Sequence, residues 1–255
     1  MRINGSFRAR LLAGEFLAGS WLNLGSPLTA EMAGLSGFDW VMLDHEHGPG
    51  SDETIVSQLQ AVAATPAVCF VRIAANEPPR FKRVLDLGAM GVMVPYVSTP
   101  AEARAAVAAM RYPPRGIRGV AKLTRATTFG AGFDEYFAHA HEWLVTMTQI
   151  ETAEAVENAA AIAAIDGVDV LFIGPMDLTT SLGISGDYEH PRTIEAFRHV
   201  AACAKAAGKA AGILLQNPAH VPMCRDLGYT FIALGSDGGA ASAGFRQAIT
   251  ALRAK

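Results

Sequence analysis

Eight short apolar segments, separated by helical patterns, constrain the fold of this chain more than any other feature of its sequence. Most are continuously apolar, which is typical of strands that are covered on both faces of a parallel sheet. Eight strands alternating with helices predict an α/β fold, a (β/α)8 TIM barrel, and 255 residues suit a single barrel domain over residues 1–255. The predicted strands are residues 16–22, 40–45, 67–73, 91–97, 144–150, 169–174, 211–216 and 230–235.

Helix-start signals stand between these segments. Thr99 is followed by Pro100 and Glu102, which predicts an N-cap, a proline at the first helical position and a capping box. Other caps or periodic patterns predict helices over residues 51–64 and 239–253 and after Thr152, His190-Pro191 and Asn217-Pro218.

Two connections bear on this architecture. An open doubly wound sheet is the rival fold, but residues 23–34 lack the G-x-G-x-x-G turn that it would carry after its first strand. Residues 111–137, between the fourth and fifth predicted strands, form a far longer connection than usual and contain several prolines and glycines. We therefore predict that this long segment is an active-site loop.

Composition and charge exclude several classes of protein. Hydrophobic residues make up 51% of the chain and the net charge is −3, so a packed core is expected and the basic surplus of a nucleic-acid-binding protein is missing. No run of 18 apolar residues exists, which argues against a membrane partner, and the N-terminal segment lacks the apolar stretch of a signal peptide. Cys69, Cys203 and Cys224 fit neither a disulfide framework nor a zinc site, so we expect a cytoplasmic protein.

Two acidic residues follow successive predicted strands. Glu151 closes VTMTQIE and Asp177 follows VLFIGPMD, and in a barrel both strand ends meet at the rim that carries the active site. Paired carboxylates suit a hard divalent cation, and oxygen ligands favour Mg²⁺ or Mn²⁺ over zinc. The alternative is that Glu151 only supports the N-terminus of the helix after Thr152.

The segment Asp44-His45-Glu46-His47 follows the second predicted strand. Two histidines in H-x-H spacing are compatible with metal ligation from one face of the strand. Asp44, three residues before His47, could instead orient that ring as a general base. A third interpretation is that both histidines are ordinary loop residues before Gly48, and the residues alone leave these alternatives open.

Arg72 ends an apolar strand, where an unpaired charge is costly. It either pairs with an acidic neighbour such as Glu46 or meets an anionic substrate, and the two are compatible. Catalysis through a Schiff base would need a desolvated lysine. None of the five lysines lies within a predicted strand, which argues against an imine-forming aldolase.

Six motifs in order resemble the HpcH/HpaI family of metal-dependent, class II 2-oxo acid aldolases, which includes 4-hydroxy-2-oxoheptanedioate and 2-dehydro-3-deoxyglucarate aldolases. The resemblance covers the chain from about Trp21 to Asp237, and the motifs are LDHEHGP, VRI…VLDLGA, RYPPRGIRGV, QIET, IGPMDLTTSLG and AAGKAAGI.

The resemblance implies roles for the rim residues. Glu151 and Asp177 match the family's metal ligands, for Mg²⁺ or Mn²⁺ with Co²⁺ as a further candidate. Arg72 matches the arginine that contacts the 2-oxo group and its enolate. His47 matches the catalytic histidine and Asp44 the aspartate that orients it, which leaves His45 non-catalytic.

Further residues match the family at the substrate site and between subunits. Gln149 matches a glutamine near the bound oxo acid, and the backbone amides of Met176 and Asp177 would meet the substrate carboxylate. Asp86 matches another site acid, yet its place before the fourth strand puts it at the opposite end of its own barrel, so it would act in a neighbouring subunit. The family forms barrel dimers that exchange the last helix and assemble into homohexamers, as trimers of dimers. Met176 departs from the small residue common in the family.

The resemblance thus implies reversible retro-aldol cleavage of 4-hydroxy-2-oxo acids to pyruvate, or hydroxypyruvate, and an aldehyde. Two alternatives are a lyase of the citryl- or malyl-CoA type on the same barrel and a non-catalytic barrel that binds a metabolite. A CoA enzyme would be expected to carry additional basic residues for its thioester substrate.

Overall fold

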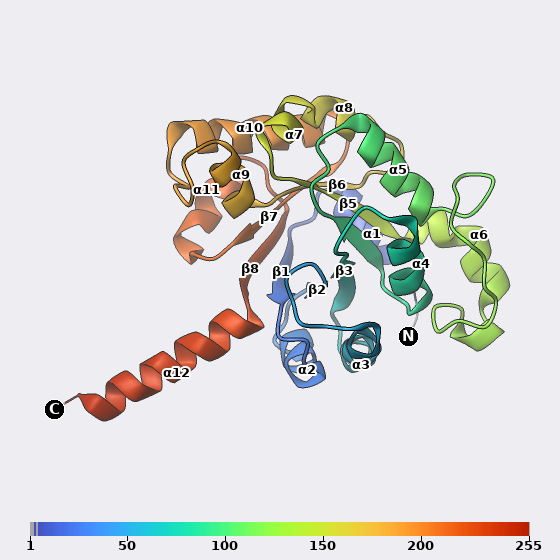
Figure 1. Cartoon of the computed structure of the whole chain (residues 1–255), viewed down its shortest axis with the longest axis horizontal. Helices are drawn as coiled ribbons and strands as arrows, with labels where there is room; N and C mark the ends of the chain where they lie inside the picture. The colour runs from blue at the N-terminus through green and yellow to red at the C-terminus, as the bar shows by residue number, and fades with distance from the viewer. Residues whose placement is uncertain (1–2, 4, 255) are drawn as a thin grey trace.

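Eight parallel strands close into a barrel in which each strand pairs with its two sequence neighbours and β8 pairs with β1 (Figure 1). This computed structural model describes residues 3 and 5–254. The closed single-domain α/β barrel confirms the predicted fold, and every predicted strand is present with its ends shifted by at most three residues. The strands are β1 Leu17–Leu22, β2 Trp40–Asp44, β3 Val68–Arg72, β4 Gly91–Val94, β5 Val145–Ile150, β6 Val170–Ile173, β7 Ala210–Leu215 and β8 Phe231–Ser236.

Helices surround this barrel, and the predicted start signals are confirmed. Thr99 and Glu102 form the predicted capping box, and the side chains of Ser51, Thr152 and His190 cap the helices that follow them. The helices are α1 Ser6–Leu12, α2 Pro27–Leu35, α3 Asp52–Val62, α4 Pro78–Asp86, α5 Pro100–Met110, η1 Thr128–Gly130, α6 Phe133–Trp143, α7 Ala153–Glu157, α8 Ala159–Ala163, α9 Pro175–Ser181, α10 Pro191–Ala206, η2 Pro218–His220, α11 Val221–Asp226 and α12 Asp237–Arg253.

Aromatic side chains fill the interior of the barrel. Trp40 of β2 stacks on Phe231 of β8 with ring centroids 3.9 Å apart, and it also meets Phe172 of the opposite strand β6 at 6.4 Å. A Cβ on Gly19 would lie 2.1 Å from the Trp40 ring, so only glycine leaves room for this indole. Phe7 of α1 packs against the rings of Phe70 and Phe231 and helps to close the amino-terminal end of the barrel. Buried polar side chains lie instead at the carboxyl ends of the strands, among them Asp44, Arg72, Gln149 and Glu151.

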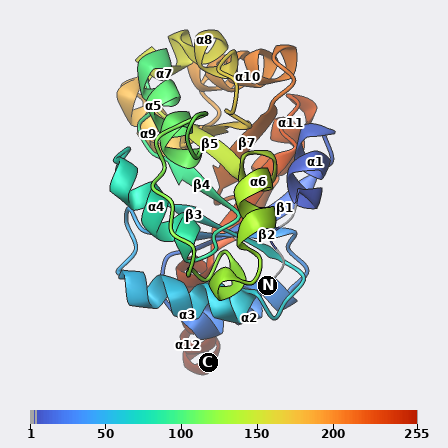
Figure 2. The ribbon, with the colours of Figure 1, turned by 90° about the vertical axis from the view of Figure 1, so that its right-hand side faces the viewer.

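The long segment between α5 and α6 does not lie at that carboxyl end, so the prediction that it is an active-site loop is wrong for this chain's own site. The Ala126 N–H donates to the carbonyl of Asp86 at 3.0 Å, and the Arg125 side chain donates to the carbonyl of Leu87. Both acceptors lie where α4 leads into β4, at the amino-terminal end of the barrel. Figure 2 brings this segment and α6 to the front.

The last helix, α12, projects away from the barrel as a separate rod (Figure 1). None of its described residues is buried, and Phe245 and Leu252 are 77% and 82% exposed. The Gly239 N–H donates to the Ser236 hydroxyl and so caps the start of this helix, which sets its direction at the end of β8.

Candidate active site

Asp44 and Arg72 form a buried ion pair at the carboxyl ends of β2 and β3. They are register partners in the sheet, and both carboxylate oxygens accept from the guanidinium, at 3.0 Å from Nε and 2.5 Å from Nη2. Trp21 donates its indole N–H to Asp44 at 3.1 Å, and the centroid of its ring lies 5.1 Å from the guanidinium carbon of Arg72. Burial alone would raise the pKa of Asp44, but hydrogen bonds and charge from Arg72 lower it, so the carboxylate stays ionised.

Asp44 also fixes the loop that carries Glu46 and His47. Its Oδ1 accepts the backbone N–H groups of Glu46 at 3.0 Å and His47 at 3.1 Å. The expectation that Asp44 orients the His47 ring is therefore corrected: Asp44 holds the backbone of His47, and the structure, over the residues that it describes, gives no hydrogen bond or ion pair between Asp44 and the imidazole. An aspartate side chain commonly accepts hydrogen bonds from the backbone N–H groups two and three residues later in the same turn. The His47 side chain points away from this turn, so the Asp44 carboxylate reaches the amides and not the ring.

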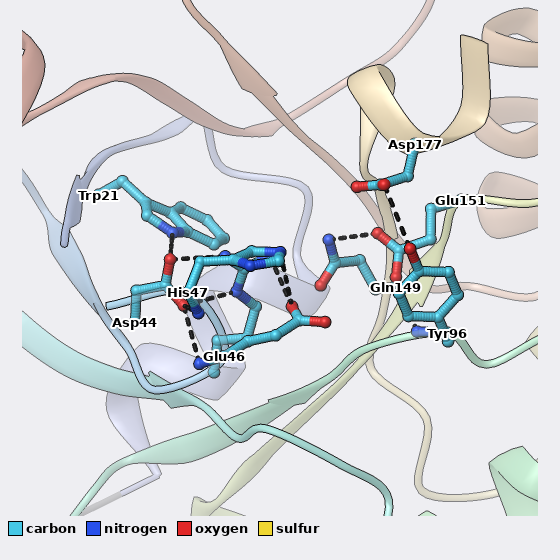
Figure 3. A network of polar contacts seen from close by, with 9 residues as sticks. Trp21, Asp44, Glu46, His47, Tyr96, Gln149, Glu151 and Asp177 are labelled. Carbon is cyan, nitrogen blue, oxygen red and sulfur yellow. Dashed lines mark hydrogen bonds and ion pairs between the residues drawn. The ribbon is translucent and has the colours of Figure 1, made fainter. Parts of the chain in front are cut away.

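The His47 ring is exposed at the mouth of the barrel. Its side chain is 67% exposed, and Nε2 lies 3.9 Å from Glu46 Oε2 (Figure 3). His45 points elsewhere, into a cavity of about 400 Å³ beside α3 and α4, and burial lowers its pKa. The two histidines thus face different surroundings, which argues against joint metal ligation by H-x-H.

Arg72 meets a second carboxylate. Its Nη1 lies 2.8 Å from Glu46 Oε2, so the predicted pairing of Arg72 with Glu46 is confirmed. Burial raises the pKa of Glu46 and the charge of Arg72 opposes that rise. A guanidinium has five N–H donors, and the two hydrogen bonds to Asp44 use one on Nε and one on Nη2, which leaves donors for a substrate oxygen.

Glu151 lies at the end of β5 and is 1% exposed. Its Oε1 accepts the Tyr96 backbone N–H at 2.7 Å and its Oε2 accepts from Gln149 Nε2 at 2.6 Å. The helix that follows is capped by the Thr152 side chain instead, so Glu151 is not merely a helix-terminal residue. Burial, opposed by the Tyr96 N–H and reinforced by the charges of Glu46 and Asp177, raises the pKa of Glu151 to about 7.

Asp177 faces Glu151 from the first turn of α9 (Figure 3). Its Oδ1 accepts the hydroxyl of Tyr96 at 3.2 Å. Met176 precedes it, is half-exposed and projects at the rim, and the amides of both residues lie in the uncapped first turn of the helix. The structure therefore brings together the two carboxylates that the strand-end pattern paired.

Gly174, between β6 and α9, allows this close approach. A Cβ at this position would lie 2.3 Å from Glu151 Oε2 and 2.9 Å from Gln149 Nε2. Gln149 Oε1 is buried and has no hydrogen-bond partner in the described part of the chain. A buried carbonyl oxygen beside a raised-pKa carboxylate is an acceptor that a ligand or water can satisfy.

Asp86, a predicted site residue, lies away from the rim, whereas Tyr96, which the sequence did not indicate, lies at it. Asp86 lies at the end of α4, at the opposite end of the barrel as expected, and pairs with the buried guanidinium of Arg118 at 2.7 Å. Tyr96 contacts both Glu151 and Asp177, but the sequence pattern places it inside a predicted strand over residues 91–97 and so does not indicate a site residue. The signal that could have found it is Pro95, whose missing N–H ends the ladder at Val94.

Fold and rim together define an enzyme of the (β/α)8 class, with acid, base and guanidinium groups gathered at the carboxyl ends of the strands. Residues 17–243 match the family described as HpcH/HpaI aldolase/citrate lyase, and the chain belongs to this family. The protein is thus an aldolase, a carbon–carbon lyase, as the motifs predicted.

Curated relatives and solved structures agree with this assignment. The 5-keto-4-deoxy-D-glucarate aldolase of Salmonella paratyphi C is 44% identical over 234 residues, which cover 92% of this chain and 91% of that relative. A HpcH/HpaI aldolase/citrate lyase family protein from Burkholderia cenocepacia is 40% identical, with a TM-score of 0.94 over 98% of this chain and 100% of the other. The HpcH/HpaI aldolase from Desulfitobacterium hafniense is 27% identical, with a TM-score of 0.90 over 97% and 96% of the two chains.

Two sequence-based exclusions are also addressed by the structure. Cys69, Cys203 and Cys224 are all free, as their spacing predicted. Among the described residues, no helix has the length and apolar character needed to cross a membrane.

Proposed function

We propose that this protein is a divalent-metal-dependent aldolase that reversibly cleaves 4-hydroxy-2-oxo acids to pyruvate, or hydroxypyruvate, and an aldehyde. The observation that carries the proposal is the charge arrangement at the rim. Arg72 is held by Asp44 and Glu46, while Glu151 and Asp177 face each other without a cationic side chain in contact among the described residues. Arg72 can therefore bind an oxyanion, and the carboxylates of Glu151 and Asp177 can bind a cation.

The name of the curated relatives described above, 5-keto-4-deoxy-D-glucarate aldolase, supports a sugar-acid substrate. A 5-keto-4-deoxyglucarate has carboxylates at both ends and a methylene group between its keto and hydroxyl carbons. Retro-aldol cleavage breaks the bond between that methylene and the hydroxyl-bearing carbon, and it yields pyruvate and a hydroxy-aldehyde acid. The proposed donor is thus pyruvate and the proposed acceptor an aldehyde with its own carboxylate.

The residues fit a divalent cation. Glu151 and Asp177 supply oxygen ligands alone, which suits Mg²⁺ or Mn²⁺, with Co²⁺ as a further candidate. The raised pKa of Glu151 arises from burial and neighbouring carboxylates, a cost that a bound cation removes. The described residues contain no cluster of three or more acidic, histidine or cysteine side chains in a ligating arrangement, so water and substrate would fill the other positions. When bound, the cation would polarise the 2-oxo group as a Lewis acid.

The other rim residues take roles that follow from their contacts. Arg72 donates to the 2-oxo oxygen and stabilises the negative charge that develops there when the carbon–carbon bond breaks. His47 takes the proton from the substrate hydroxyl and returns a proton to the methylene carbon of the enolate, which gives pyruvate, and Asp44 positions His47 by holding its backbone. Gln149 lies beside the oxo acid, and the amides of Met176 and Asp177 receive its carboxylate.

The test is an assay for pyruvate release from 4-hydroxy-2-oxo acids, with a panel of aldehydes for the reverse reaction. Activity should disappear on treatment with a chelator and return with Mg²⁺ or Mn²⁺. Full activity in the chelated enzyme, with the metal content verified as zero, would remove the metal from the proposal.

Replacement of Gly174 by alanine should lower kcat by about 10-fold or more. The new Cβ would displace the Glu151 carboxylate, and a shift on the order of 1 Å at a catalytic site can cost about 100-fold. Pyruvate release under saturating Mg²⁺ measures the effect. Gly132→Ala is a matched control, because its Cβ would meet no atom nearer than 3.5 Å and its backbone lies at φ −109°. Equal kcat values for the two variants would contradict the predicted role of the Glu151 position.

The exposed last helix supports a subunit assembly. We propose that α12 is exchanged between subunits of a homo-oligomer, a hexamer built as a trimer of dimers, and that Asp86 acts in a neighbouring subunit's site. A rod with no buried residue would leave Phe245 and Leu252 in water, whereas a partner barrel would cover them.

Phe245→Asp should therefore convert the assembly to smaller species and lower activity, because a charge would enter the apolar contact. Light scattering after size-exclusion chromatography measures the mass. Arg246→Ala, one position along the same helix, is the matched control. An unchanged mass for Phe245→Asp would count against the exchange of α12.

A further inference from the structure

Tyr96 has contacts with both carboxylates of the proposed cation site. Its backbone N–H donates to Glu151 Oε1 at 2.7 Å, and its phenolic hydroxyl donates to Asp177 Oδ1 at 3.2 Å (Figure 3). Within the part of the chain that the structure describes, no other residue is hydrogen-bonded to both. A single residue that follows β4 therefore connects Glu151, directly after β5, with Asp177 in the first turn of α9.

The backbone of Tyr96 adopts an unusual conformation. Its φ is +50°, in the left-handed region that few residues other than glycine occupy. This conformation costs roughly 1 kcal/mol or more and is often found at functional sites. Here it directs the N–H to Glu151 while the ring, 52% exposed, extends across the mouth toward Asp177.

Asp177 depends on this contact more than Glu151 does. Glu151 is buried and accepts hydrogen bonds from two residues, Tyr96 and Gln149. Among the residues that the structure describes, the Asp177 side chain accepts a hydrogen bond from the Tyr96 hydroxyl alone. A carboxylate that binds a cation with one oxygen is commonly held by a donor on the other, and such donors affect metal affinity strongly.

We propose that Tyr96 is a positioning residue of the metal site, whose hydroxyl orients the Asp177 carboxylate toward Glu151 before a cation binds. This inference rests on the proposed function for the existence of the cation. It assigns no step of the reaction to the phenol: the hydroxyl acts through Asp177.

The test is the affinity of the metal-free full-length protein for Mn²⁺, measured by titration calorimetry and by the electron paramagnetic resonance signal of free Mn²⁺. Tyr96→Phe keeps the ring and the backbone N–H but removes the hydroxyl, and it should weaken Mn²⁺ binding by about 10-fold. At saturating metal its kcat should return to near the wild-type value, and its thermal unfolding without metal should be unchanged. A merely structural role would move the unfolding temperature and leave metal affinity alone.

Tyr188→Phe is the matched control. Burial and then the charge of Asp177 raise the pKa of Tyr188, but no hydrogen bond joins the two residues in the part of the chain that the structure describes. Its Mn²⁺ affinity should equal that of the wild type. Tyr96→Gly, which accepts φ +50° without strain, should lose as much affinity as Tyr96→Phe because both lack the hydroxyl.

The outcomes separate this inference from the proposed function. Wild-type affinity in Tyr96→Phe, with Mn²⁺ bound by the wild type, would overturn the role of Tyr96 and leave the metal site in place. Weak binding in Tyr96→Gly alone would assign the effect to the ring and also overturn it. A wild-type protein that binds no Mn²⁺ would overturn both proposals.

Discussion

Replacement of Arg72 by lysine should lower kcat for pyruvate release by about 100-fold or more, although the charge is kept. The guanidinium reaches both oxygens of Asp44 and the carboxylate of Glu46, and it has donors left for the substrate. An ammonium group is a single point of charge that cannot reproduce this fork. Loss of one donor to a developing oxyanion typically costs about 10²- to 10³-fold in kcat.

The Arg72 variant also loses structural contacts, so a matched variant is needed. Arg8 donates through Nε and Nη2 to Asp169 at 3.0 and 2.8 Å, and this pair lies at the start of β6, at the other end of the barrel. Arg8→Lys should therefore lower the unfolding temperature without lowering kcat. If both variants lost kcat equally, the effect of Arg72 would be on the fold and its role at the oxyanion would be rejected.

The barrel could be predicted because burial on both faces leaves a direct mark on the sequence. Strands such as β2 and β6 are apolar at nearly every position, and their number determines closure. The same logic placed Glu151 and Asp177 together, since the carboxyl ends of all strands meet at one rim. Pairing of Arg72 with Glu46 followed from the cost of a buried unpaired charge.

The contacts of the loops were less predictable. Asp44 bonds the amides of its own turn, a local interaction that competes with any contact to the His47 ring. The left-handed backbone of Tyr96 depends on its tertiary partners Glu151 and Asp177, which no local pattern reveals.

The sequence contains a signal that places the long segment between α5 and α6 at the correct end of the barrel. The capping box at Thr99 starts α5 directly after β4, so the long connection must follow that helix. A helix that packs back along its strand ends at the amino-terminal side of the barrel, which is where Arg118 and Asp86 meet. Length alone identified an exceptional connection but not the end of the barrel at which it lies.

Replacement of Glu151 by glutamine should have opposite effects on activity and stability. Pyruvate release should fall by about 1,000-fold, because the variant loses one of the two proposed ligands of the cation and glutamine binds hard cations weakly. The amide is close to isosteric, so its oxygen can still accept the Tyr96 N–H, and its NH2 can donate to Gln149 Oε1 once the Gln149 side-chain amide turns over. Steady-state kinetics over a range of Mg²⁺ concentrations measures the loss.

The metal-free variant should be more stable than the wild type at pH 8, by on the order of 3 kcal/mol. Burial, with the charges of Glu46 and Asp177, raises the pKa of Glu151 to about 7, above the ordinary value of 4.5, so ionisation is disfavoured in the folded chain. The cost is fully present above pH 7 and is lost as the pH falls toward 4.5. Urea unfolding at pH 8 and pH 5 should show this difference shrinking.

Added Mg²⁺ should reverse the order of stability. A cation that binds only the folded wild type raises its unfolding temperature, while the glutamine variant should not respond. Asp169→Asn, at another buried carboxylate remote from the rim, should keep the wild-type response to Mg²⁺. A Glu151→Gln protein that is destabilised without metal and still stabilised by Mg²⁺ would show that this carboxylate supports the fold and does not bind the cation.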